Sequence, residues 1–173
     1  MKKTVFTTII TLIFFGFYQK IFAQQPYINK VWEYIGVTPG QYDYVSSKLH
    51  PNGKFIFIGN NESNGQTEIL VTCIGIDGSV EWQQSTNGAI GQNDYGTDII
   101  TDSNGNIFIC GAIHNGSNMD YKIIKYSSNG TVLWEDEYNG TGNGDDIPIG
   151  IQKDDSDNIY ITGSSMGIGT TTD

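Results

Sequence analysis

Short apolar runs alternate with polar turns along most of the chain, and the pattern is clearest in its central third. The runs there are rich in Ile, Val, Tyr, Phe and Thr, residues that suit a pleated surface. They predict four short strands, at 95–101, 106–111, 121–127 and 131–138. Asn-Gly pairs at 104–105 and 129–130 separate the first two strands and the last two, and supply the positive φ angles that tight hairpin turns require. The pattern therefore predicts a four-stranded antiparallel unit.

The same unit occurs once before this stretch and begins again after it. Successive glycines that end the second predicted strand are 52 residues apart, and the tryptophans of the fourth strand are 50 and 52 residues apart. These repeat positions are Gly59, Gly111, Gly163, Trp32, Trp82 and Trp134. The aspartates that open the units, Asp43, Asp94 and Asp145, are 51 residues apart. A fixed period near 50 predicts a repeat architecture.

Four antiparallel strands in a unit of about 52 residues are typical of the blade of a β-propeller. The run Ile107–Cys110 is apolar at successive positions, as expected of an inner strand that neighbouring blades cover on both faces. A β-helix would have much shorter units, and an extended β-sandwich would lack a fixed period. The sequence therefore predicts an all-β fold, a β-propeller of four-stranded antiparallel blades that is present as an incomplete ring.

The repeat sets the expected boundaries. They are a signal peptide at 1–23, a lone fourth strand at 27–36, blades at 43–86 and 94–138, and an incomplete blade at 145–173. In closed propellers an N-terminal strand often completes the last blade, and we expect the strand at 27–36 to have this role. The third unit stops before its third strand, and a closed ring needs about four blades. We therefore expect a fragment of a longer protein, with downstream repeats of the same chain missing.

One segment carries a resemblance to a known family. From Asp102 to Trp134 the chain contains Asn-Gly-Asn-Ile-Phe-Ile-Cys-Gly, then Asp-Tyr-Lys-Ile-Ile-Lys-Tyr, then Asn-Gly-Thr-Val-Leu-Trp. This order resembles the SBBP-type β-propeller repeat of exported bacterial proteins, and the likeness extends over nearly all of 31–173. The resemblance implies a modular secreted or cell-surface propeller that is usually part of a longer chain. It implies little about activity.

The N-terminus and the charge indicate where the protein works. A basic head, an apolar run from Thr4 to Tyr18 and a small residue at Ala23 match a Sec-type signal peptide cleaved before Gln24. The alternative, a membrane anchor, needs about 20 apolar residues and the run is shorter. The net charge is −10 and arginine is absent, so nucleic acid and anionic membranes are poor partners. We expect a secreted or cell-surface protein.

Candidate chemistry is sparse. Propeller topology places the loops before each first strand and the loops between second and third strands on one rim, where a polar ligand can bind. The rim candidates are Asp94, Asp120, Asp145 and Asp146. No catalytic set, cofactor site or metal site emerges, because neither histidine has metal-ligand spacing and the Asp102 turn lacks the glutamate of a calcium loop. Cys73 and Cys110 either pair in a disulfide or serve as buried side chains.

The sequence leaves two alternative functions. The first is a non-enzymatic scaffold or binding module whose ligand is an unknown protein or polysaccharide. The repeated tryptophans either form a sugar-binding surface or pack between blades, and regular recurrence favours packing. The second is a quinoprotein-like or carbohydrate-active propeller enzyme, based on the Gly-x-x-x-Trp spacing at Gly78 to Trp82 and Gly130 to Trp134.

Overall fold

A computed structural model describes residues 19–25, 28–34 and 42–168 of the chain. This part contains twelve β-strands, nearly all joined by short turns. Within it, no helix is long and apolar enough to cross a membrane. The prediction of an all-β fold is confirmed. The apolar segment at 4–18 lies outside the described residues, so the signal peptide stays a prediction.

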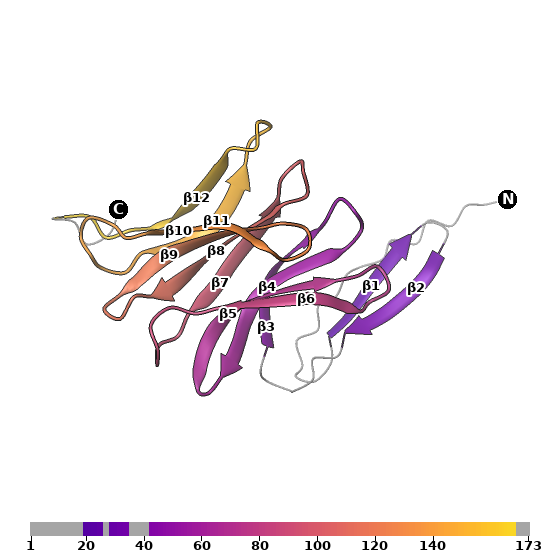
Figure 1. Cartoon of the computed structure of the whole chain (residues 1–173), viewed down its shortest axis with the longest axis horizontal. Coiled ribbons are helices and arrows are strands. Elements are labelled where there is room, and N and C mark those ends of the chain that lie inside the picture. The colour runs from indigo at the N-terminus through magenta and orange to yellow at the C-terminus, as the bar shows by residue number, and fades with distance from the viewer. Residues whose placement is uncertain (1–18, 26–27, 35–41, 169–173) are drawn as a thin grey trace, which may run out of the picture.

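Two four-stranded antiparallel sheets and two hairpins make up the fold (Figure 1). The first sheet has the order β3 (Tyr42–Leu49), β4 (Phe55–Ser63), β5 (Gln66–Ile74) and β6 (Val80–Thr86). The second has the order β7 (Tyr95–Thr101), β8 (Ile107–His114), β9 (Met119–Tyr126) and β10 (Val132–Tyr138). The hairpins are β1 (Gln19–Gln25) with β2 (Ile28–Tyr34), and β11 (Ile147–Lys153) with β12 (Ile159–Ser164).

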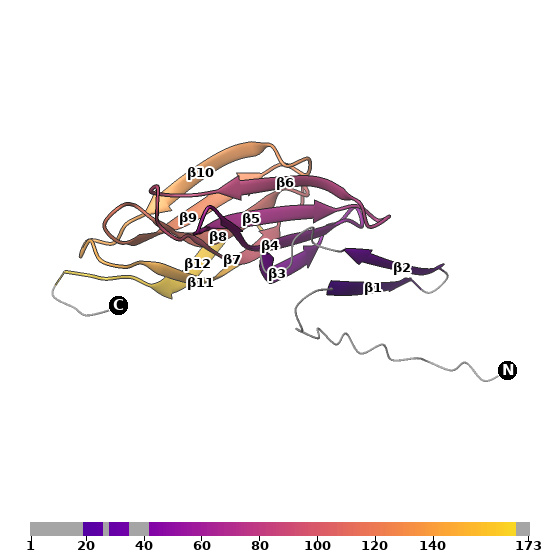
Figure 2. The same cartoon turned by 90° about the horizontal axis from the view of Figure 1, so that it is seen from below.

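The predicted units match the observed sheets, since each four-stranded sheet is a meander whose strands pair in chain order. The third unit contains only β11 and β12 in the described residues. The strand expected at 27–36 is present as β2, but it pairs with β1 in a separate hairpin, which Figure 2 shows apart from the larger sheets. The described residues form no closed ring.

A β-bulge in each first strand explains the repeated glycines. The register shifts lie between Tyr44 and Ser46, between Gly96 and Asp98, and between Pro148 and Gly150. The residue opposite each bulge is the repeat glycine of the second strand, for example Gly111 opposite Gly96. A Cβ on Gly111 would lie 2.5 Å from the carbonyl oxygen of Tyr95. Glycine is needed because the bulged backbone approaches too closely for a side chain.

Successive sheets pack face to face, with the first strands β3, β7 and β11 next to one another (Figure 1). One core lies between the first and second sheets and includes Ile56, Ile58, Ile107 and Ile109, each fully buried. A second core, around Phe108, lies between the second sheet and the β11–β12 hairpin. The second sheet is therefore covered on both faces, which accounts for the uninterrupted apolar run in β8.

Candidate functional site

Asp94 is one of two predicted rim residues, with Asp146, that have no exposed surface. Its two carboxylate oxygens accept hydrogen bonds from the backbone N–H groups of Gly88 and His114, each at 2.7 Å. Its own N–H donates to the carbonyl oxygen of Thr67 at 2.8 Å. The carboxylate thus joins the loop before β7 to the end of β8 with both oxygens engaged, and the backbone N–H of Asp94 adds a bond to the start of β5.

Asp146 makes the same contacts in the next unit. Its oxygens accept from the N–H groups of Gly140 at 2.6 Å and Met166 at 3.1 Å, and its N–H donates to Met119 O at 2.7 Å. Every one of these residues lies 52 positions after its counterpart around Asp94. The structural equivalent of Asp94 is therefore Asp146, and the 51-residue alignment of Asp94 with Asp145 is wrong by one position.

Asp145 is the exposed member of the set. Its carboxylate accepts a hydrogen bond from the N–H of Met119 at 3.0 Å. Asn93, one unit earlier, does the same for the N–H of Thr67 at 2.8 Å. Both side chains join the start of a third strand to the loop that precedes a first strand. One oxygen of the Asp145 carboxylate accepts a hydrogen bond, and the side chain is exposed. The carboxylate is therefore accessible to a ligand.

Asp120 is buried at the start of β9. Its oxygens accept from the side-chain amides of Asn115 at 2.7 Å and Asn118 at 3.4 Å. Burial raises the pKa of Asp120, a shift that the Asn115 hydrogen bond opposes and the charge of Asp146 reinforces. The structure therefore brings Asp120, Asp145 and Asp146 together around the start of β9, whereas Asp94 lies at the junction of the first and second units.

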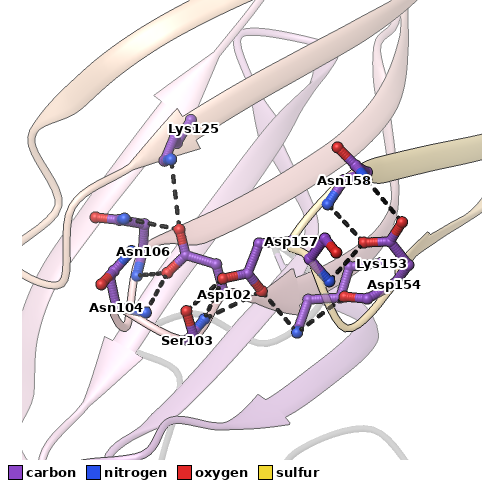
Figure 3. Close-up of polar contacts among 10 residues, drawn as sticks. Asp102, Ser103, Asn104, Asn106, Lys125, Lys153, Asp154, Asp157 and Asn158 are labelled. Atoms are coloured by element: carbon purple, nitrogen blue, oxygen red, sulfur yellow. Dashed lines mark hydrogen bonds and ion pairs between the residues drawn. The ribbon is translucent and has the colours of Figure 1, made fainter.

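A second polar network lies on the turns at the other ends of the first strands (Figure 3). Asp102 accepts hydrogen bonds from the N–H groups of Asn104 at 2.9 Å and Asn106 at 2.7 Å, and it pairs with Lys125 at 3.4 Å. Burial raises the pKa of Asp102, but the hydrogen bonds from Asn106 and Lys125 outweigh it, so the net shift is downward. Asp154 holds the next turn in the same way.

Asp157 connects the two turns of this network. Its carboxylate accepts hydrogen bonds from the N–H and hydroxyl of Ser103 in the preceding unit and from Lys153 Nζ at 2.7 Å (Figure 3). The Lys153 and Ser103 hydrogen bonds lower the pKa of Asp157 to about 2. In the first two units the corresponding turns are joined by His50, whose Nε2 lies 2.7 Å from Gly105 O.

Asp98 was not among the predicted site residues, because it lies inside a predicted strand and not in a loop. Its Oδ1 accepts from the hydroxyl of Ser46 at 2.8 Å, and its Oδ2 accepts from the N–H of Ile151 at 3.2 Å. One carboxylate therefore bonds to β3 on one side and β11 on the other. Asp98 follows the register shift of β7, which lies between Gly96 and Asp98.

The tryptophans have different environments. Trp82 packs against the core between the first and second sheets, 6.1 Å from the ring of Tyr126, and its indole N–H donates to Ser128 O at 3.3 Å. Trp134 contacts Phe108 edge-on at 5.9 Å but is 42% exposed. Trp32 lies in β2, and its side chain is outside the described residues.

Cys73 and Cys110 are both free and buried, and they lie in separate cores. Burial raises the pKa of Cys73 to about 11 and that of Cys110 to about 12, so both thiols are protonated and unreactive at neutral pH. Among the residues that the structure describes, no group of three or more His, Cys, Asp or Glu side chains is arranged to hold a metal ion.

Comparisons with known proteins add information on the fold alone. No family model matches the chain, and no curated protein matches it. Among solved structures, the chain is similar to a protein of unknown function from Bacteroides caccae, with a TM-score of 0.52 and 15% sequence identity. The match covers 83% of this chain and 48% of that one, so the chain spans about half the length of the protein it matches.

Proposed function

We propose that the protein is an exported β-propeller protein, similar to the SBBP-type repeat proteins, that serves as a non-enzymatic scaffold or binding module at the cell surface. The observation that supports it is the recurrence of the inter-unit contacts: Asp94 and Asp146 make the same hydrogen bonds 52 residues apart. The first strands of successive sheets also lie next to one another. Blades of a propeller stack in this way around a common axis.

The engagement of the carboxylates favours a scaffold over an enzyme. Asp94, Asp102 and Asp146 are buried, and their oxygens accept hydrogen bonds that hold loops and turns in place. The polar groups left at the rim are side chains such as Asn93 and Asp145, which are exposed. Exposed amides and carboxylates on loops suit recognition of a polar protein surface or a polysaccharide.

The alternative of a quinoprotein-like or carbohydrate-active enzyme has less support. It was based on the spacing of Gly130 and Trp134, yet Gly130 is the residue that receives Trp82 of the preceding unit. A Cβ on Gly130 would lie 2.6 Å from Trp82 Cδ2, and its φ of +83° is unfavourable for other residues. Packing between units therefore accounts for Gly130 and Trp82.

Fractionation of cells that produce the complete coding sequence tests the export. We expect the protein in the extracellular or surface-exposed fraction with Gln24 as its first residue. An intact Met1 in the cytoplasmic fraction would contradict the proposal.

Co-sedimentation with a panel of insoluble polysaccharides, followed by size analysis of each polysaccharide, tests the binding role. A binding module retains the polymer at its original length, and exchange of Asp145 for alanine should weaken binding with only a small change in the melting temperature. Shortened polymer after incubation would support the enzyme instead.

A further inference from the structure

Eight asparagines in this chain are each followed by glycine, and all eight pairs lie in turns or loops of the described residues. The asparagines are Asn52, Asn64, Asn87, Asn104, Asn115, Asn129, Asn139 and Asn143. Asparagine is chemically labile, because the backbone nitrogen of the next residue can attack its side-chain carbonyl carbon. The attack is easiest before glycine, which has no Cβ to obstruct the approach. The eight pairs share this sequence feature, so the structure has to distinguish them.

The glycine nitrogen must lose its proton before it attacks, so a hydrogen bond donated by the glycine N–H protects the pair. Three of the glycines use this N–H to close a hairpin turn. The bonds run from Gly53 to His50 O, from Gly105 to Asp102 O and from Gly130 to Ser127 O, at 2.8, 3.1 and 2.9 Å. The asparagines before these glycines are exposed. Exposure of the asparagine therefore does not separate reactive pairs from protected ones.

Side chains hold the pairs that lie in the loops. Gly88 N–H donates to Asp94 at 2.7 Å, Gly140 N–H donates to Asp146 at 2.6 Å, and Gly116 N–H donates to His114 Nδ1 at 3.0 Å. The pair Asn143–Gly144 is held by different contacts. Asn143 Oδ1 accepts a hydrogen bond from Asn139 Nδ2 at 3.0 Å, and Gly144 packs against Met166. Seven of the eight pairs are thus restrained.

Asn64 and Gly65 lack these restraints. They are the two central residues of the turn between β4 and β5, with φ of 53° and 77° as in a type I′ turn, and both are exposed. The hydrogen bond that closes a β-turn joins its first and fourth residues, here Ser63 and Gln66, so it leaves the Gly65 N–H unused. Within the described part of the chain, neither this N–H nor the Asn64 side chain forms a hydrogen bond. A Cβ on Gly65 would meet no atom within 4 Å.

We propose that Asn64 is a site of spontaneous deamidation and the first of the eight asparagines to react in the folded protein. The Gly65 nitrogen bonds to Asn64 Cγ, the bond from Cγ to the amide nitrogen breaks, and ammonia leaves with the proton that Gly65 gave up. The product is a cyclic succinimide, which water then opens. Hydrolysis of the bond from the ring nitrogen to Cγ gives aspartate. Hydrolysis of the bond to the main-chain carbon gives iso-aspartate, in which the main chain runs through the side chain.

The reaction changes the rim beside the loop that precedes β7. Gln66 Oε1 accepts a hydrogen bond from Gly91 N–H at 2.8 Å, and Thr67 N–H donates to Asn93 Oδ1 at 2.8 Å. Aspartate adds one negative charge at the tip of the turn. Iso-aspartate also adds a methylene to the main chain, so Ser63 and Gln66 lose the geometry of a two-residue turn. The contacts between this hairpin and the loop before β7 should therefore loosen.

Incubation of the full purified protein in mildly alkaline buffer, followed by peptide mapping with mass spectrometry, compares all eight asparagines in one sample. Replacement of an amide by a carboxyl group changes the peptide mass, and fragmentation assigns the change to one residue. We expect Asn64 to deamidate at least about fivefold faster than any other, the factor expected where one hydrogen bond must break before the reaction. The protein unfolded in urea is the control, and there the advantage of Asn64 should disappear because the turns are absent.

Asn64→Gln should abolish most of the acidic species that accumulates on ion-exchange chromatography, since the longer side chain closes the corresponding ring far more slowly. Asn129→Gln is the matched control, because Asn129 is exposed in a hairpin turn but the following N–H, of Gly130, is hydrogen-bonded. It should leave the acidic species unchanged. Equal effects of the two substitutions would overturn the proposal. So would another asparagine that reacts as fast as Asn64 in the folded protein, or an Asn64 that reacts only after unfolding.

Discussion

Replacement of Asp94 by alanine tests whether the predicted rim carboxylates are structural. Asp94 has no exposed surface, and it is the acceptor for two backbone N–H groups, those of Gly88 and His114. Alanine removes both acceptor oxygens and leaves two donors in a site with little access for water. The substitution therefore separates the loop before β7 from the end of β8 without changing an exposed surface.

The magnitude follows from the two donors. A donor left without a partner in a buried site costs about 1–3 kcal/mol, so Asp94→Ala should lower the free energy of unfolding by roughly 2–6 kcal/mol. This loss is a large part of the about 5–15 kcal/mol by which a domain is usually stable. Asp94→Asn keeps one acceptor oxygen and should cost about half as much. Asp146→Ala should behave in the same way, because it removes the equivalent pair of hydrogen bonds.

Urea denaturation followed by tryptophan fluorescence measures the effect, with the slope of the transition compared between variants. Asp145→Ala is the matched control, since Asp145 is exposed and accepts one hydrogen bond; it should cost less than about 1 kcal/mol. A loss below about 1 kcal/mol for Asp94→Ala would refute a structural role. Unchanged stability together with lost ligand binding would assign Asp94 to a binding site instead.

Three further predictions concern the contacts between units. Gly130→Ala should destabilise the protein by about 2 kcal/mol or more in urea denaturation, because alanine at φ +83° is strained and its Cβ would meet Trp82. Trp82→Ala should cost about 3–5 kcal/mol and Trp134→Ala clearly less, since Trp134 is more exposed; equal costs in the same assay would contradict the assigned packing. Asp157 has a depressed pKa in the folded protein. The ionised carboxylate therefore stabilises the fold above the ordinary pKa near 3.8, and this stabilisation is lost as the pH falls toward 2. Melting temperatures should therefore fall less between pH 4 and pH 2 in Asp157→Asn than in the unaltered protein, and equal falls would contradict this.

The strands and their grouping into antiparallel sheets were largely predictable from the sequence because several independent signals agree. Apolar runs gave the strands, Asn-Gly pairs gave the turns, and the 52-residue period separated the units. The completion of the last blade by the N-terminal strand stays a prediction, because the described residues form no closed ring. Trp32 marks β2 as similar to a fourth strand, but the partner of a strand depends on tertiary contacts, and β2 pairs with β1. Local sequence patterns predict where a strand lies more reliably than they predict which strand it pairs with.

The candidate site was predicted less well, since an aspartate at a loop gives the same sequence signal in two roles. A carboxylate that binds a ligand at a rim and one that accepts backbone N–H groups both appear next to Asn and Gly. The two roles differ in the burial of the carboxylate. Burial depends on where the strand begins, because neighbouring side chains of a strand point to opposite faces. Asp94 and Asp146 each come one position before an exposed residue that begins a first strand, so their side chains point inward.

The third unit shows how one contact between units can override a local rule. The turn between the first and second strands contains glycine with positive φ at Gly53 and Gly105, and the same position is Asp157, with φ +61°. Glycine is the residue that the turn alone favours, because aspartate in this conformation is strained. The Asp157 carboxylate, however, bonds to Ser103 of the preceding unit, which glycine cannot do. Asp157→Gly should therefore relax the turn and loosen the junction between units. Faster hydrogen exchange confined to the 102–106 turn and the β11–β12 hairpin would identify the junction as the reason for the aspartate.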